Sequence, residues 1–179
     1  RLKYEQYLTY LNSCGFEINV YPFFERYTYK ILYQRGYFFE KIFGVLVGVL
    51  RRLAQLPLIL QADGVYIHLH VIPLGPSFFE WLFLRLSKRT IYDIDDMVHQ
   101  LRTSSSNKMA SWAKSNSRYF LLLKNSNHVI TCTPDLDKLA RKYNDHTTDI
   151  SSTINTLTYL PINRYKNGHE IIIGWTGSH

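Results

Sequence analysis

Thr90-Ile91-Tyr92-Asp93-Ile94-Asp95-Asp96 is the stretch of sequence that decides the fold. Its apolar first part predicts a strand over 90–94, and three carboxylates stand where that strand ends. A helical pattern precedes it at 78–86, and another follows it up to about residue 124. Strands that alternate with helices in this way predict an α/β fold with a mainly parallel sheet.

The same alternation extends in both directions along the chain. We expect helices over 4–14 and 27–56, and strands over 16–21, 64–70 and 128–132. Gly15 should end the first helix in a left-handed conformation, and Thr133 should cap a helix that begins at Pro134. Gly44 and Gly48 lie on one helix face and predict close packing there. The helix over 78–86 is apolar on most sides, which predicts that it is buried.

Composition describes a folded chain of one domain and a remnant. The 179 residues are 46% hydrophobic and 15% aromatic, which excludes a disordered protein. A polar segment near Tyr165 divides a domain over 1–163 from the opening of a second α/β domain over 164–179. Cys14 and Cys132 are predicted to be small buried thiols of a reducing compartment. The longest apolar run, 42–50, is shorter than the roughly 20 residues of a membrane-spanning helix.

A net charge of +7 favours an anionic partner. The basic residues come in pairs at 51–52, 88–89 and 141–142, each at the end of an apolar helical run. Cations at the carboxyl ends of helices explain this spacing, because they complement the helix dipole. No nucleic-acid-binding motif accompanies them, so nucleic acid is not an expected partner.

The acidic cluster is the leading candidate site. Asp93, Asp95 and Asp96 follow a strand at the sheet edge where open α/β proteins bind their ligands, and we assign them as catalytic candidates; capping of the loop is the alternative role. His68 and His70 leave one face of the preceding strand, and with His99 they are candidates for acceptor binding; a hydrogen-bonded structural role is the alternative for His68 and His70. Because His-x-His lacks a third ligand at a defined spacing, no metal is expected.

A second candidate site stands near the end of the chain. Gly174, Trp175, Gly177 and Ser178 follow the apolar run 171–173, as a phosphate-binding loop follows its strand. Glycines let backbone amides approach an anion closely. We therefore predict that these four residues bind the phosphates of a donor.

The order of several motifs resembles a known family. They are the runs Arg1-Leu2-x5-Leu8-x2-Leu11-x3-Gly15, Ile91-Tyr92-Asp93-Ile94-Asp95-Asp96, Val129-Ile130-Thr131-Cys132-Thr133-Pro134, Ile154-Asn155-Thr156-Leu157-Thr158-x2-Pro161 and Gly174-Trp175-Thr176-Gly177-Ser178. Together they look like the amino-terminal half of family 4 glycosyltransferases, followed by the start of the second half. Two departures stand out: Thr156 and Thr158 replace a Gly and an acidic residue of the junction signature, and Asp95 stands where many members carry a histidine.

The resemblance implies the GT-B fold, in which two Rossmann-like domains face each other across a cleft. It implies a retaining transfer without metal or other cofactor, from a nucleotide-sugar to a polysaccharide or lipid-linked acceptor. Such an enzyme is expected to be cytoplasmic, with peripheral contact to an acidic membrane surface. A first strand should precede Arg1, and most of the donor site should lie beyond His179, so these 179 residues alone are expected to be inactive.

Two other functions fit the acidic cluster. An aspartyl-phosphate hydrolase would use Asp93 as nucleophile and Asp95 as acid and base, although that family expects Ser or Thr where this chain has Met97. A non-catalytic α/β binding module would keep the fold alone.

Overall fold

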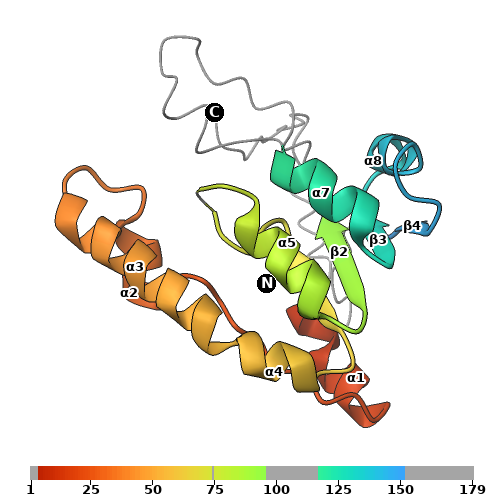
Figure 1. Ribbon diagram of the computed structural model, residues 1–179, viewed down its shortest axis with the longest axis horizontal. Helices are drawn as coiled ribbons and strands as arrows, with labels where there is room; N and C mark the ends of the chain where they lie inside the picture. The colour runs from red at the N-terminus through yellow and green to blue at the C-terminus, as the bar shows by residue number, and fades with distance from the viewer. Residues whose placement is uncertain (1–3, 74, 96–116, 152–179) are drawn as a thin grey trace, which may run out of the picture.

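The structure is a computed structural model, and it describes residues 4–73, 75–95 and 117–151. Its centre is a parallel four-stranded sheet (Figure 1). The strands, in spatial order, are β1 (Val65–His68), β2 (Thr90–Ile94), β3 (His128–Thr131) and β4 (Thr147–Asp149). The predicted α/β class with a parallel sheet is therefore confirmed.

One face of the sheet carries the hydrophobic core. Helices α5 (Phe78–Leu86) and α7 (Ser117–Asn125) lie side by side, and α8 (Pro134–Ala140) packs against β3 and β4. Tyr92 and Ile94 alternate with Asp93 along β2 and are fully buried among Leu122 and Leu123 of α7. Since successive strand residues point to opposite faces, Asp93 belongs to the other face of the sheet.

The amino-terminal third forms an arm of helices beside the sheet (Figure 1). Its elements are η1 (Glu5–Tyr7), α1 (Leu8–Ser13), α2 (Arg26–Ile31), α3 (Phe38–Ala54) and α4 (Leu56–Gln61). The main contacts of α3 are with α2 and α4, not with the strands. A Cβ atom at Gly44 would collide with Thr28, and one at Gly48 would lie 2.6 Å from the Phe23 ring. The predicted packing role of both glycines is confirmed.

The predicted strand over 16–21 is wrong. These residues form no helix or strand and pair with no strand among the described residues, and Phe16, Val20 and Tyr21 are exposed. Alternation of apolar and polar residues sets which side chains share a face, but a strand exists only where a neighbour completes its ladder. Side chains hold the segment instead, because Arg52 donates to the Tyr21 carbonyl and Arg51 to that of Pro22.

Two other boundaries and one further strand differ from the prediction. The helix over 27–56 is interrupted between α2 and α3, where Gly36 and Tyr37 take left-handed backbone conformations. The strand over 64–70 ends at His68, because Leu69 has a φ of 60°. Strand β4 was not predicted, since its sequence Thr-Thr-Asp has no apolar alternation.

Several local predictions hold. The Thr133 side chain caps α8 by accepting a hydrogen bond from the Leu136 amide at 3.3 Å, and Gly15 ends α1 with a φ of 88°. Each of the three basic pairs stands in the last turn of a helix or within three residues of its end.

Two expectations about burial are wrong. Cys14 is exposed, since α1 buries none of its residues. Helix α5 is only half-buried, and it turns Glu80 inward while Phe78 and Trp81 face solvent. Glu80 is the single acidic residue of α5, and its carboxylate accepts a hydrogen bond from the loop after β1. A buried polar group needs such a partner, so this contact, and not the apolar sequence pattern, sets which side of α5 faces inward.

The apolar helical segment formed by α3 and α4 is longer than the apolar run 42–50 in the sequence. The segment Phe38–Gln61 is long and apolar enough to cross a membrane, judged by length and composition alone. Core helices of soluble proteins pass the same test, but only 28% of the most apolar part of this segment is buried. The predicted domain boundary at 163 and the run 171–173 lie outside the described residues.

Candidate functional site

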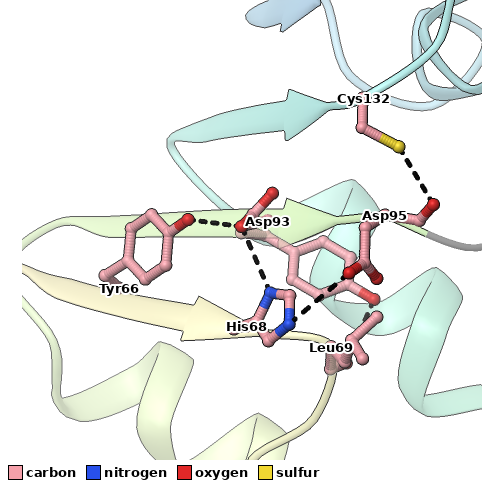
Figure 2. Close-up of polar contacts among 7 residues, drawn as sticks. Tyr66, His68, Leu69, Asp93, Asp95 and Cys132 are labelled. Carbon is pink, nitrogen blue, oxygen red and sulfur yellow. Dashed lines mark hydrogen bonds and ion pairs between the residues drawn. The ribbon is translucent and has the colours of Figure 1, made fainter. Parts of the chain in front are cut away.

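The ends of β1 and β2 bring together a histidine and two carboxylates (Figure 2). His68 is the register partner of Asp93, and its Nδ1 lies 3.2 Å from Asp93 Oδ2. The Tyr66 hydroxyl donates to the same oxygen from the start of β1. Asp93 is fully buried. Because its carboxylate accepts, the contact places a proton on Nδ1 and orients the imidazole.

Burial and charge both act on the tyrosine of this group. Burial raises the pKa of Tyr66 far above its ordinary value, and the hydrogen bond to Asp93 and that carboxylate's charge raise it further. The hydroxyl therefore keeps its proton and remains a donor. The Tyr4 ring lies over this face, 5.6 Å from the His68 ring and 6.1 Å from the Tyr66 ring.

Asp95 follows β2 and is open to solvent, unlike Asp93. About a third of its side chain is exposed, and its Oδ2 lies 3.7 Å from His68 Nε2. Its Oδ1 is shielded and has no hydrogen-bond partner within the described part of the chain. The Cys132 thiol donates to the Asp95 carbonyl at 2.9 Å, which ties the end of β2 to the end of β3.

Buried charges fix the loop that leaves β1, a feature that the sequence analysis missed. Arg118 donates to the Ile72 carbonyl at 2.5 Å, and Glu80 accepts from the Ile72 amide at 3.4 Å. Arg52 donates to the Val71 carbonyl at 2.9 Å. Glu80 and Arg118 are each the only charge pointing inward from an apolar stretch of helix, and that pattern is the sequence signal that was available.

His70 lies in this loop and not on the strand with His68. Burial lowers the pKa of His70 to about 4, and the charges of Arg118 and His68 contribute in the same direction. Its Nδ1 is shielded and has no hydrogen-bond partner among the described residues. His70 is therefore neutral at physiological pH.

Six candidate residues lie outside the described residues: Asp96, His99, Gly174, Trp175, Gly177 and Ser178. Within residues 4–73, 75–95 and 117–151, no three His, Cys, Asp or Glu side chains come together in a way that could hold a metal ion. Asp93 and Asp95 do not form a two-carboxylate site, because Asp93 is enclosed by Tyr66 and His68.

Comparison with known proteins does not assign this chain to a family. No family model, curated protein or solved structure matches this chain. What the site can do follows from its geometry: a buried carboxylate orients an imidazole, which faces an accessible carboxylate at the carboxyl edge of a parallel sheet. Such a pair can accept hydrogen bonds from hydroxyl groups and can hold or pass a proton.

Proposed function

We propose that this chain is the acceptor-binding domain of a retaining, nucleotide-sugar-dependent glycosyltransferase of the GT-B type. It would act at the cytoplasmic face of a membrane on a polysaccharide or lipid-linked acceptor. One observation carries the proposal: His68 stands between the buried Asp93 and the accessible Asp95, at the sheet edge where α/β proteins bind ligands. The motif order of the sequence supports the same assignment.

Sugar acceptors present hydroxyl groups, and Asp95 is suited to receive one. The exposed part of its carboxylate can accept the hydroxyl hydrogen, and His68 Nε2 lies 3.7 Å from Oδ2. In the transfer, the bond between the acceptor oxygen and the anomeric carbon forms as the bond from that carbon to the donor phosphate breaks. The hydroxyl proton leaves with the diphosphate. The negative charge of Asp95 would favour both the polarised hydroxyl and the positive charge that develops on the sugar.

The same geometry argues against the phosphatase alternative. A nucleophilic Asp93 would have to reach a phosphorus atom, but this side chain is fully buried and its Oδ2 accepts from Tyr66 and His68. A reacting nucleophile needs an open approach of about 3 Å to its target. A non-catalytic binding module would keep the site geometry, so only an assay of turnover separates it from an enzyme.

The test is Asp95→Asn in the full-length protein, incubated with nucleotide-sugars and assayed for released nucleoside diphosphate. The change keeps side-chain size and removes the charge, so kcat should fall by roughly a hundredfold or more. Donor affinity should change little, because the proposed donor site lies in the other domain. The melting temperature should stay nearly constant, since Asp95 is partly exposed.

Asp145→Asn is the matched control. Asp145 is also exposed, but it precedes β4 and therefore lies at the opposite edge of the sheet. Its substitution should leave kcat unchanged. Normal turnover in Asp95→Asn would remove Asp95 from the site, and a large loss of melting temperature with proportionate loss of activity would make its role structural. If the wild-type protein turns over none of the nucleotide-sugars, the result would favour a non-catalytic binding module over a glycosyltransferase.

A further inference from the structure

Helix α3 is turned so that its apolar side chains face outward and its cations face the protein. Its outer face consists of exposed apolar residues at helical spacing: Phe38, Phe39, Ile42, Phe43, Leu46, Leu50 and Leu53. Arg51 donates to the Pro22 and Phe23 carbonyls at 3.2 and 3.3 Å, and the buried Arg52 donates to Val71 and Tyr21. A helix on the surface of a soluble protein normally shows the reverse arrangement.

The outer face of α3 is long and uninterrupted. No charged residue occurs from Ile42 to Leu50, and Leu58 and Leu60 of the following helix α4 are also exposed. The opposite face of α3 is docked, since Gly44 and Gly48 pack against Thr28 and Phe23. A helix attached to its domain along one side can lie on a bilayer but cannot leave the protein to cross it.

A second set of exposed residues near α3 has the composition of a membrane interface. Helix α2 packs against the docked side of α3 through Thr28, and with the turn after it exposes Tyr27, Tyr29 and Tyr33 together with the cations Arg26, Lys30 and Arg35. Tyrosine is enriched at headgroup level, and cations beside an apolar helix attract anionic lipids. The net charge of +7 acts in the same direction. A hollow of about 510 Å³ between α2 and α3 is lined by the rings of Tyr27, Phe39 and Phe43, and also by Glu25, Glu40 and Arg51.

A second copy of the chain fits this face less well than lipid does. Paired helices use a narrow apolar seam flanked by charged residues, which set the partner and the register. Here the positions that flank the seam between Ile42 and Leu50 are valine or glycine. The apolar surface is therefore too wide and too uniform for a defined helix pair, whereas a bilayer demands neither register nor charge pairs.

We propose that the outer face of α3 seats this protein on a bilayer that contains anionic lipid. The apolar side chains enter the boundary between headgroups and acyl chains, and the net charge of +7 attracts the anionic surface. This inference goes beyond sugar transfer. Vesicle binding needs no donor or acceptor, so it can fail or succeed independently of the proposed function.

The experiment is flotation of the protein with vesicles in a density gradient, which separates bound protein from aggregates. One set of vesicles is phosphatidylcholine, and the other is equal parts phosphatidylcholine and phosphatidylglycerol. Ile42→Glu and Leu50→Glu each place a charge on the outer face of α3. Ile150→Glu is the control, because Ile150 is 45% exposed against 44% for Ile42 and follows β4, far from α3 in Figure 1.

Wild-type protein should float with the anionic vesicles and much less with the neutral ones. Both α3 variants should lower partitioning by roughly tenfold or more, since a carboxylate must enter the interface, while Ile150→Glu stays within about twofold of wild type. Melting curves of all variants verify folding, which exposed positions should preserve. The proposal is overturned if wild type does not float, if the α3 variants float normally, or if all three variants lose binding equally. It is also overturned if light scattering shows a dimer that Ile42→Glu dissociates without any vesicle binding.

Discussion

The contact between Gly48 and Phe23 sets the orientation of α3, so it is the point at which to test the arm. A Cβ atom at position 48 would lie 2.6, 2.7 and 2.9 Å from Cζ, Cε1 and Cε2 of the Phe23 ring. Ordinary contacts between carbon atoms are about 3.5–4.0 Å, so the ring would have to move by about 1 Å. It is held on two sides, by the edge of the Phe24 ring at a centroid distance of 4.8 Å and by the Arg52 guanidinium at 5.7 Å.

Two effects of Gly48→Ala oppose each other. Alanine is a better helix former than glycine by about 1 kcal/mol, which stabilises the variant. Overpacking a well-filled contact costs about 1–3 kcal/mol. The sum predicts a net loss of about 1 kcal/mol in the free energy of unfolding, measured by urea denaturation.

A second background makes the sign of the effect decisive. Phe23→Leu removes the three ring atoms with which the new methyl group collides, so in this background Gly48→Ala should stabilise by up to about 1 kcal/mol. Gly64→Ala is the control, since its Cβ would meet nothing closer than 3.6 Å. The reasoning is refuted if Gly48→Ala stabilises the protein equally with and without the Phe23 ring, because helix propensity alone would then account for it.

Three further predictions concern buried polar groups and a cap, each read from the free energy of unfolding. The pKa of His70 is lowered to about 4 by burial, so wild type should lose stability as pH falls from 6.5 towards 4, by roughly 3 kcal/mol at most, and His70→Gln should lack this loss; equal pH profiles would contradict the burial. Burial raises the pKa of Glu80, so its ionisation costs stability as pH rises above about 4.5. Glu80→Gln should therefore be stabilised relative to wild type at pH 7 but not at pH 4, and a pH-independent difference would refute this. Thr133→Ala should cost about 1 kcal/mol through loss of the cap of α8, and an unchanged value would show that the 3.3 Å bond contributes nothing.

The parts of the fold that were predictable are those set by neighbours in the sequence. Thr90–Ile94 is a strand with the predicted bounds, and Thr133 caps α8 through an amide three residues away. Such features depend on side-chain alternation and on local hydrogen bonds. The error at 16–21 has the opposite cause, since the alternation is present there but no described strand pairs with it.

The candidate site was predictable in location but not in its division of roles. Asp93 and Asp95 point to the same face of the sheet and look alike in the sequence. In the structure Asp93 lies within β2, where it pairs with His68 and its carboxylate accepts a hydrogen bond from Tyr66. Asp95 lies after the last residue of β2, where its side chain is partly exposed. Register between strands that are 25 residues apart in sequence decides this difference, and no local pattern encodes it.

Buried charges explain why two helices of this protein present apolar side chains to solvent. Arg52 of α3, Glu80 of α5 and Arg118 of α7 all bind the backbone of Val71 or Ile72 in the loop after β1. A buried charge without a partner is far more costly than an exposed apolar side chain, so these contacts fix the rotation of each helix. Arg52 points inward at the end of α3. The apolar residues on the other side of the helix, among them Phe39, Phe43 and Leu50, therefore face outward. The hydrogen bond from Arg52 to the Val71 carbonyl thus connects the end of α3 to the loop that follows His68. Through this contact, the orientation of the surface proposed to meet lipid is linked to the geometry of the candidate site.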